Sequence, residues 1–128
     1  MSHRVAFLQL VRYKNLLIIV LTQYFIRLAF VNIFLPFPAL SNLEFVLFVF
    51  TTILITAAGY IINDIYDVRI DAINKKGRII IGEKIKAKTA IMLYSFFNFI
   101  ALCLGVYLAI IIGKPLYSLI FVYCIFFL

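Results

Sequence analysis

The chain has 128 residues, of which 66% are hydrophobic and only 13% charged, and its mean hydropathy is +1.16. Soluble domains carry about 45–50% apolar and about 25% charged residues, and disordered chains are rich in charge, so this composition excludes both classes. It predicts an integral membrane protein. The net charge of +7 then places basic residues at a membrane surface and does not indicate nucleic-acid binding.

The hydropathy pattern predicts an all-α fold, a polytopic transmembrane bundle with three full spans and an incomplete fourth. Pro36 and Pro38 end the first apolar run, because proline cannot continue the hydrogen bonds of a helix. The fourth run is shorter than the roughly 20 residues that a spanning helix needs. We therefore expect the N-terminal part of a larger domain. The expected spans are Leu16–Leu35, Leu43–Ile62, Thr89–Ile112 and the incomplete Leu116–Leu128.

Basic residues predict the orientation of these spans. Ten of the 12 Lys and Arg residues lie in the N-terminal tail or in the connection Asn63–Lys88, which follows the second span. Cytoplasmic loops of membrane proteins carry such an excess of positive charge. We therefore expect a cytoplasmic N-terminus and a cytoplasmic loop over residues 63–88.

The acids form one cluster at the end of the second span. Asp64, Asp67 and Asp71 are three of the five acids in the chain, and Asn63 precedes them. On a helix, Asn63, Asp67 and Asp71 share an arc of about 80°, with Asp64 about 20° beyond it. Carboxylates at a helix C-terminus are disfavoured, so a compensating cation is expected, such as Mg²⁺ held together with substrate phosphates. The alternative is a solvated face whose acids pair with neighbouring lysines. The polar face continues into the span through Thr52, Thr56 and Gly59.

The cluster resembles a known sequence signature. Asn63-Asp64-x-x-Asp67-x-x-x-Asp71 is similar to the NDxxDxxxD motif of the UbiA-type intramembrane prenyltransferases, which lies at the cytoplasmic end of their second transmembrane helix. Two flanking patterns extend the resemblance over the whole chain. Arg12 and Asn15 resemble the R-x-x-N at the start of the first helix. Asn74, Arg78 and Gly82 resemble a basic loop in which Ile79 replaces the usual proline.

The resemblance implies Mg²⁺-dependent transfer of a polyprenyl group from a prenyl diphosphate to an acceptor within the membrane. The implied metal ligands are Asn63, Asp67 and Asp71, and the implied catalytic acids are Asp64, Asp67 and Asp71. Implied partners are the diphosphate donor, membrane lipid and a hydrophobic or aromatic acceptor (a quinone precursor or a polar-lipid precursor), with no nucleic acid. The expected location is a bacterial inner membrane, with the active-site loop cytoplasmic. Candidate contacts to the diphosphate are Arg69, Lys75, Arg78, Asn15 and Arg27.

Several alternatives stay open. Arg27 lies deep in the first span and either helps to hold the diphosphate or pairs with a backbone carbonyl of a neighbouring segment. The family has a second aspartate motif, DxxxD, whereas no acid follows Glu83 here. The chain alone is therefore expected to lack half of the active site, which leaves a catalytically incomplete fragment or a non-enzymatic membrane protein as alternatives. A small transporter fits less well because no carboxylate lies within the first span. A CDP-alcohol phosphotransferase also fits less well, because Val68 follows Asp67 where that family has glycine.

Overall fold

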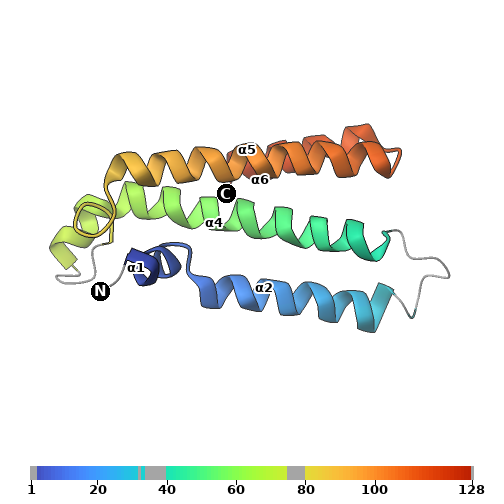
Figure 1. Ribbon diagram of the computed structural model, residues 1–128, viewed down its shortest axis with the longest axis horizontal. Coiled ribbons are helices and arrows are strands. Elements are labelled where there is room, and N and C mark those ends of the chain that lie inside the picture. Colours follow the sequence, from blue (N-terminus) through green and yellow to red (C-terminus); the bar gives the residue numbers. More distant parts are fainter. Residues whose placement is uncertain (1–2, 32, 34–39, 75–79, 128) are drawn as a thin grey trace.

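The computed structural model describes residues 3–31, 33, 40–74 and 80–127. Three long helices lie side by side, and a shorter helix folds back along the third (Figure 1). The N-terminus and the connection between α4 and α5 lie at the same end of this bundle. The described helices are α1 (His3–Leu10), α2 (Tyr13–Ile26), the π-helical η1 (Arg27–Val31), α4 (Asn42–Asn74), α5 (Ala87–Ile111), the 3₁₀ turn η2 (Pro115–Tyr117) and α6 (Ser118–Phe127).

Helix α4 begins where the sequence indicates and ends later than expected. At its start, the Ser41 N–H donates to Glu44 Oε2 (2.6 Å) and the Glu44 N–H donates to Ser41 Oγ (3.3 Å), which is a capping box. Its 33 residues give a length of about 50 Å. The segment that was expected to be a loop from Asn63 onward is therefore helical as far as Asn74. The helix continues because Ile65 and Val68 still pack against the hydrophobic core.

Two helices are long and apolar enough to cross a membrane, α4 over Asn42–Val68 and α5 over Ala87–Ile111. Helix α5 agrees with the expected third span within two residues at each end. The shorter apolar stretch Pro115–Phe127 corresponds to the incomplete fourth. The expected first span begins within α2 and continues through η1, while residues 32 and 34–39 lie outside the described residues. The number of spans and their orientation stay predictions.

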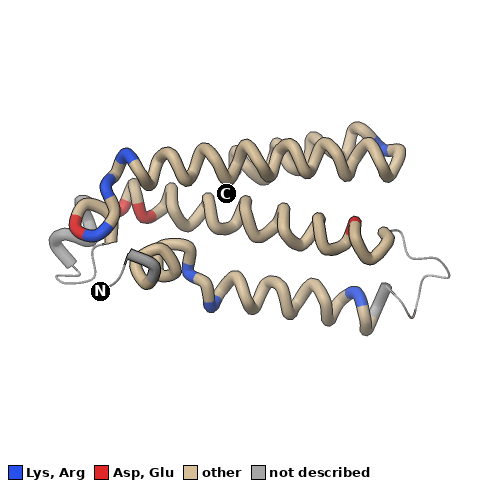
Figure 2. Tube along the Cα trace, viewed as in Figure 1, with Lys and Arg blue, Asp and Glu red and all other residues tan. Residues whose placement is uncertain are grey.

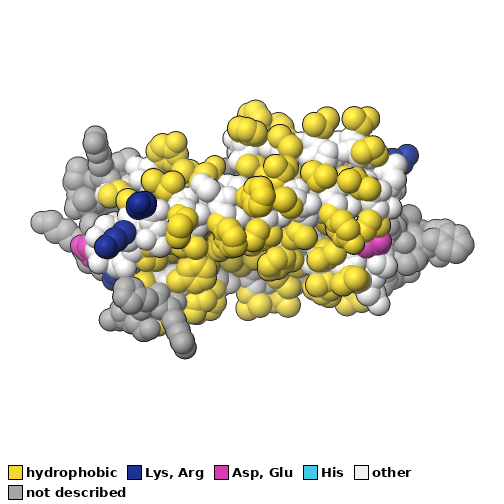
Figure 3. Space-filling view, turned by 45° about the horizontal axis from the view of Figure 1, so that its top comes forward, with side chains coloured by type: hydrophobic (Ala, Val, Ile, Leu, Met, Phe, Trp, Pro, Cys, Tyr) yellow, Lys and Arg dark blue, Asp and Glu magenta, His cyan; other side chains and the backbone are white. Residues whose placement is uncertain are grey.

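The surface of the bundle is apolar along its length and charged at its ends. Figure 3 shows hydrophobic side chains over the middle of the visible face, with charged side chains towards the two ends. Large side chains such as Phe126 and Leu116 are 80% and 76% exposed. Exposed apolar surface of this extent on a soluble protein would drive association, whereas a lipid bilayer covers it without penalty.

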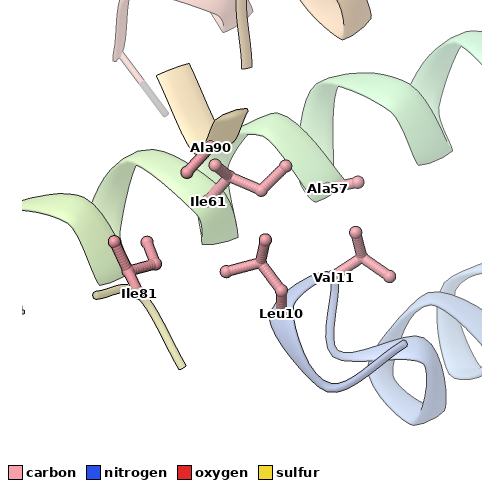
Figure 4. Packing of buried hydrophobic residues seen from close by; sticks show 6 residues of the cluster. All are labelled: Leu10, Val11, Ala57, Ile61, Ile81 and Ala90. Carbon is pink, nitrogen blue, oxygen red and sulfur yellow. The ribbon is translucent and has the colours of Figure 1, made fainter. Parts of the chain in front are cut away.

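One core cluster ties the first helix and the α4–α5 connection to the bundle. Its buried residues come from four segments that are distant in the sequence, as Figure 4 shows. The chain turns sharply between α1 and α2, where Arg12 has the left-handed backbone conformation φ 51°, ψ 53°. This turn lets the residues before it enter the core while Arg12 itself stays half exposed. The buried members of the cluster are Leu10, Val11, Ala57, Ile61, Ile81 and Ala90.

Candidate donor-binding site

The polar residues at the end of α4 contact one another as the helical spacing predicts. Asn63 Nδ2 donates to Asp67 Oδ2 at 3.2 Å, one turn further along the helix. Asp64, on the neighbouring side of the helix, accepts a hydrogen bond from an Arg12 guanidinium nitrogen at 3.1 Å. Figure 2 shows acidic residues of α4 near basic residues at the start of α2. An ion pair therefore joins the turn before α2 to the end of α4 at this end of the bundle.

Tyr60 completes this contact and was not among the residues that the sequence indicated. The Arg12 guanidinium lies over its ring, 4.7 Å from the centroid, and Asn15 Nδ2 lies 3.3 Å from its hydroxyl oxygen. Tyr60 precedes Asp64 by four residues, so helical periodicity places the two on one face. That spacing is the sequence signal that could have identified Tyr60 as part of the site. The Arg12 guanidinium is therefore held by the Tyr60 ring as well as by Asp64.

A polar pocket of about 270 Å³ opens beside these side chains. Its walls are Arg12 and Tyr60 together with Thr56, Gly59 and Asn63, which belong to the polar face of α4. The polar face that the sequence predicts on α4 thus borders a pocket in the structure. The pocket combines a cation, an amide and a hydroxyl, which are groups that bind anionic oxygen atoms.

An apolar pocket of about 450 Å³ lies further along the bundle, between α2, α4, α5 and the segment that follows α5. It is lined mainly by aliphatic and aromatic side chains, with Thr52 and Thr56 on the α4 wall. The hydroxyls of both threonines donate to backbone carbonyls one turn back, at 2.9 Å each. Their polar atoms are therefore already satisfied. Thr56 also lines the polar pocket, so the two pockets share this residue in their walls.

Residues 14–128 match the UbiA prenyltransferase family. The chain belongs to this family. It is similar to digeranylgeranylglyceryl phosphate synthase of Methanosarcina mazei, with 31% identity over 115 residues, which covers 84% of this chain and 38% of that protein. The chain thus spans well under half the length of this relative. No solved structure matches the chain.

Membership in the UbiA family accounts for the two long apolar helices, because the family is embedded in membranes. Of the residues that the sequence proposed, the structure brings Asn15, Asn63, Asp64 and Asp67 to one end of the bundle. Arg69 and Asp71 lie on the last turns of α4, where only the backbone is described. Lys75 and Arg78 lie outside the described residues.

Arg27 lies at the opposite end of the bundle. One of its guanidinium nitrogens donates to the carbonyl oxygen of Leu40 (3.1 Å) and to Asn42 Oδ1 (3.0 Å), and its guanidinium carbon lies 4.3 Å from the Phe45 ring centroid. The 15 residues from Arg12 to Arg27 correspond to about 22 Å of helix. The structure therefore does not bring Arg27 to the aspartates. It shows the alternative arrangement, in which Arg27 pairs with the backbone of a neighbouring segment.

The donor atoms at the end of α4 suit a hard divalent cation. Among the described side chains, no three of the His, Cys, Asp and Glu type converge on one point. Asn63 and Asp67 nevertheless lie one turn apart and are held together by the hydrogen bond from Asn63 Nδ2 to Asp67 Oδ2. A carboxylate oxygen is a ligand that Mg²⁺ accepts, since it is commonly bound by one or two carboxylates together with substrate phosphates. The residues present therefore fit a metal whose coordination is completed by a diphosphate and by water.

Proposed function

We propose that this chain carries the donor-binding part of a Mg²⁺-dependent prenyltransferase, which transfers a prenyl group from its diphosphate to an acceptor in the membrane. The observation that carries the proposal is a polar and an apolar pocket that share Thr56 as a lining residue. A pocket with anion-binding groups beside an apolar pocket suits an amphiphile with a charged head and a hydrocarbon tail. Membership in the UbiA family and the prenyl-lipid name of the relative support the same reaction.

Each group of this chain has a defined task in the proposed reaction. The diphosphate accumulates negative charge as the allylic C–O bond breaks, and Mg²⁺ held by Asn63, Asp67 and Asp71 would neutralise part of it. Arg12 donates N–H groups from a planar fork that fits phosphate oxygens. Asp64 and Tyr60 orient that guanidinium at the pocket wall. The apolar pocket holds the prenyl tail and keeps water from the reacting carbon.

Further contacts to the diphosphate are proposed from the family resemblance. Arg69 lies within the motif, and Lys75 and Arg78 follow it closely; all three carry the positive charge that a leaving diphosphate needs. We propose a cytoplasmic position for the site, which the excess of basic residues at this end of the bundle supports.

For the acceptor, we propose a polar-lipid precursor in preference to an aromatic quinone precursor. The relative from Methanosarcina mazei is named as the synthase of a glyceryl phosphate lipid. A glycerol phosphate bearing an isoprenoid chain is a second amphiphile that would present its hydroxyl group at the membrane surface, and the proposal places the aspartates at the same level.

The test is Mg²⁺-dependent binding of a non-hydrolysable geranylgeranyl diphosphate analogue to the detergent-solubilised chain. Asp67→Asn removes one charged metal ligand and is expected to weaken the Mg²⁺-dependent part of binding by at least about tenfold. Lys88→Gln is the control, since Lys88 is an exposed residue of α5 that lines neither pocket. Equal loss in both variants, or binding that persists in excess chelator, would contradict a metal–diphosphate site.

A further inference from the structure

A third pocket of about 690 Å³ lies at the aspartate end of the bundle, between α1, the turn that precedes α5 and the first turns of α5. Phe7 and Leu93 form an apolar wall, and Lys84 and Lys86 lie at its margin. Among the described residues, those that line this pocket line neither the polar nor the apolar pocket described above. It is therefore a separate site, and its occupation does not depend on the proposed prenyl transfer.

The turn over residues 80–85 fixes the position of the lysines. The N–H groups of Lys84 and Ile85 both donate to the carbonyl oxygen of Ile80, at 3.0 and 2.9 Å, and the Gly82 N–H donates to the carbonyl oxygen of Ile85 at 2.8 Å. Gly82 has φ 99°, a conformation in which a side chain would be strained. Ile81 is buried in the core cluster and anchors the turn. The backbone between the lysines is thus held by hydrogen bonds and by packing.

The charge of the pocket is positive. Neither Lys84 nor Lys86 forms an ion pair with any residue that the structure describes. Glu83 also lines the pocket and offsets one of the two positive charges. Two ammonium groups beside an apolar wall favour an anion that carries a hydrocarbon chain, because each half of such a ligand finds a matching surface.

We propose that this pocket binds a lipid through its phosphate group, with the phosphate at Lys84 and Lys86 and the hydrocarbon chain against Phe7 and Leu93. Phosphate is the appropriate anion because lysine ammonium groups bind it as point charges with freely rotating donors. The position of the pocket along the bundle agrees with a lipid ligand. It lies where the apolar helix α5 begins, at the level where a spanning helix would pass from the hydrocarbon into the headgroup region.

The test is native mass spectrometry of the detergent-solubilised chain titrated with dioleoyl phosphatidic acid. Lys84→Gln with Lys86→Gln removes both charges from the pocket, and a roughly 30-fold loss of affinity is expected. Lys14→Gln with Lys88→Gln removes two charges from the same end outside the pocket and should have little effect. Glu83→Gln should strengthen binding because it removes a negative charge from the pocket lining.

Two partial ligands show whether the pocket needs both the phosphate and the hydrocarbon chains of a lipid or accepts a free phosphate compound. Glycerol phosphate lacks the chains and should bind at least about tenfold more weakly, since burial of two methylenes already accounts for that factor. Dioleoylglycerol lacks the phosphate and should show no loss on removal of the two lysines. Equal loss in both double variants would mean a diffuse basic rim and overturn the proposal. Absence of saturable binding, or glycerol phosphate binding as tightly as phosphatidic acid, would overturn it as well.

Discussion

Replacing Arg12 by glycine and, separately, by alanine distinguishes the two roles that the structure gives this residue. Arg12 holds a left-handed backbone conformation between α1 and α2, and its guanidinium contacts Asp64 and Tyr60. Both substitutions remove the guanidinium. Only glycine relieves the backbone, because it has no Cβ to approach the neighbouring carbonyl oxygen. The difference between the two variants therefore reports the backbone alone.

The magnitudes follow from the geometry. The Arg12 side chain is 43% exposed, so its ion pair with Asp64 contributes at most about 1 kcal/mol, and a stacked guanidinium at an exposed ring adds about 0.5–1 kcal/mol. Alanine is thus expected to lower the free energy of unfolding by about 1–2 kcal/mol. A left-handed L-residue is strained by about 1–2 kcal/mol, and the greater freedom of unfolded glycine offsets roughly half of that. Glycine should therefore be the more stable variant by about 0.5–1 kcal/mol.

Thermal unfolding in detergent, followed by circular dichroism, measures this order of stability. Arg12→Gly should unfold a few degrees above Arg12→Ala, with the native chain highest. Binding of the diphosphate analogue should fall equally in both variants, because both lack the guanidinium. If the alanine variant proved as stable as the glycine variant, the left-handed turn at Arg12 would be refuted. Unequal donor binding would refute the assignment of the guanidinium to the donor pocket.

Two further substitutions test the distant end of the bundle and the packing of α6. Arg27→Met removes the hydrogen bonds to Leu40 and Asn42, so the free energy of unfolding should fall by about 1–3 kcal/mol. Binding of the diphosphate analogue should stay unchanged. A loss of binding at unchanged stability would contradict the placement of Arg27 away from the donor pocket. Gly105→Ala places a Cβ 2.5 Å from Phe121 Cγ, so the thermal midpoint should fall by the equivalent of about 1–2 kcal/mol. The same change in a Phe121→Ala background should have almost no effect, and an equal loss there would show that the ring is not the obstacle.

The polar face of α4 could be predicted from the sequence because it depends on local geometry alone. A period of 3.6 residues places Asn63 and Asp67 one above the other, and the structure joins them by a hydrogen bond. The start of α4 could equally be predicted from the sequence, since Ser41 and Glu44 have the spacing of a capping box. The apolar runs that became α4 and α5 were long enough to be recognised without tertiary information.

The remaining features depend on contacts between distant segments. Arg12 meets Asp64 across 52 positions of sequence, and hydropathy contains no information about such pairing. A loop was expected over residues 63–88, but α4 continues to Asn74 because Ile65 and Val68 pack against the core. Only the length of α2 shows that Arg12, which precedes this helix, and Arg27, which follows it, lie at opposite ends of the bundle.

Thr56 explains how one helix serves two incompatible environments. The diphosphate end of the proposed donor needs polar groups, and the tail needs a surface without unsatisfied hydrogen-bonding atoms. The hydroxyl of Thr56 donates to the carbonyl oxygen of Thr52, which satisfies it within α4. Thr56 can thus line both the polar and the apolar pocket without leaving its hydroxyl unsatisfied in the apolar one. A larger side chain at this shared position would take space from both pockets, so the proposed donor would lose room for its head and its tail alike.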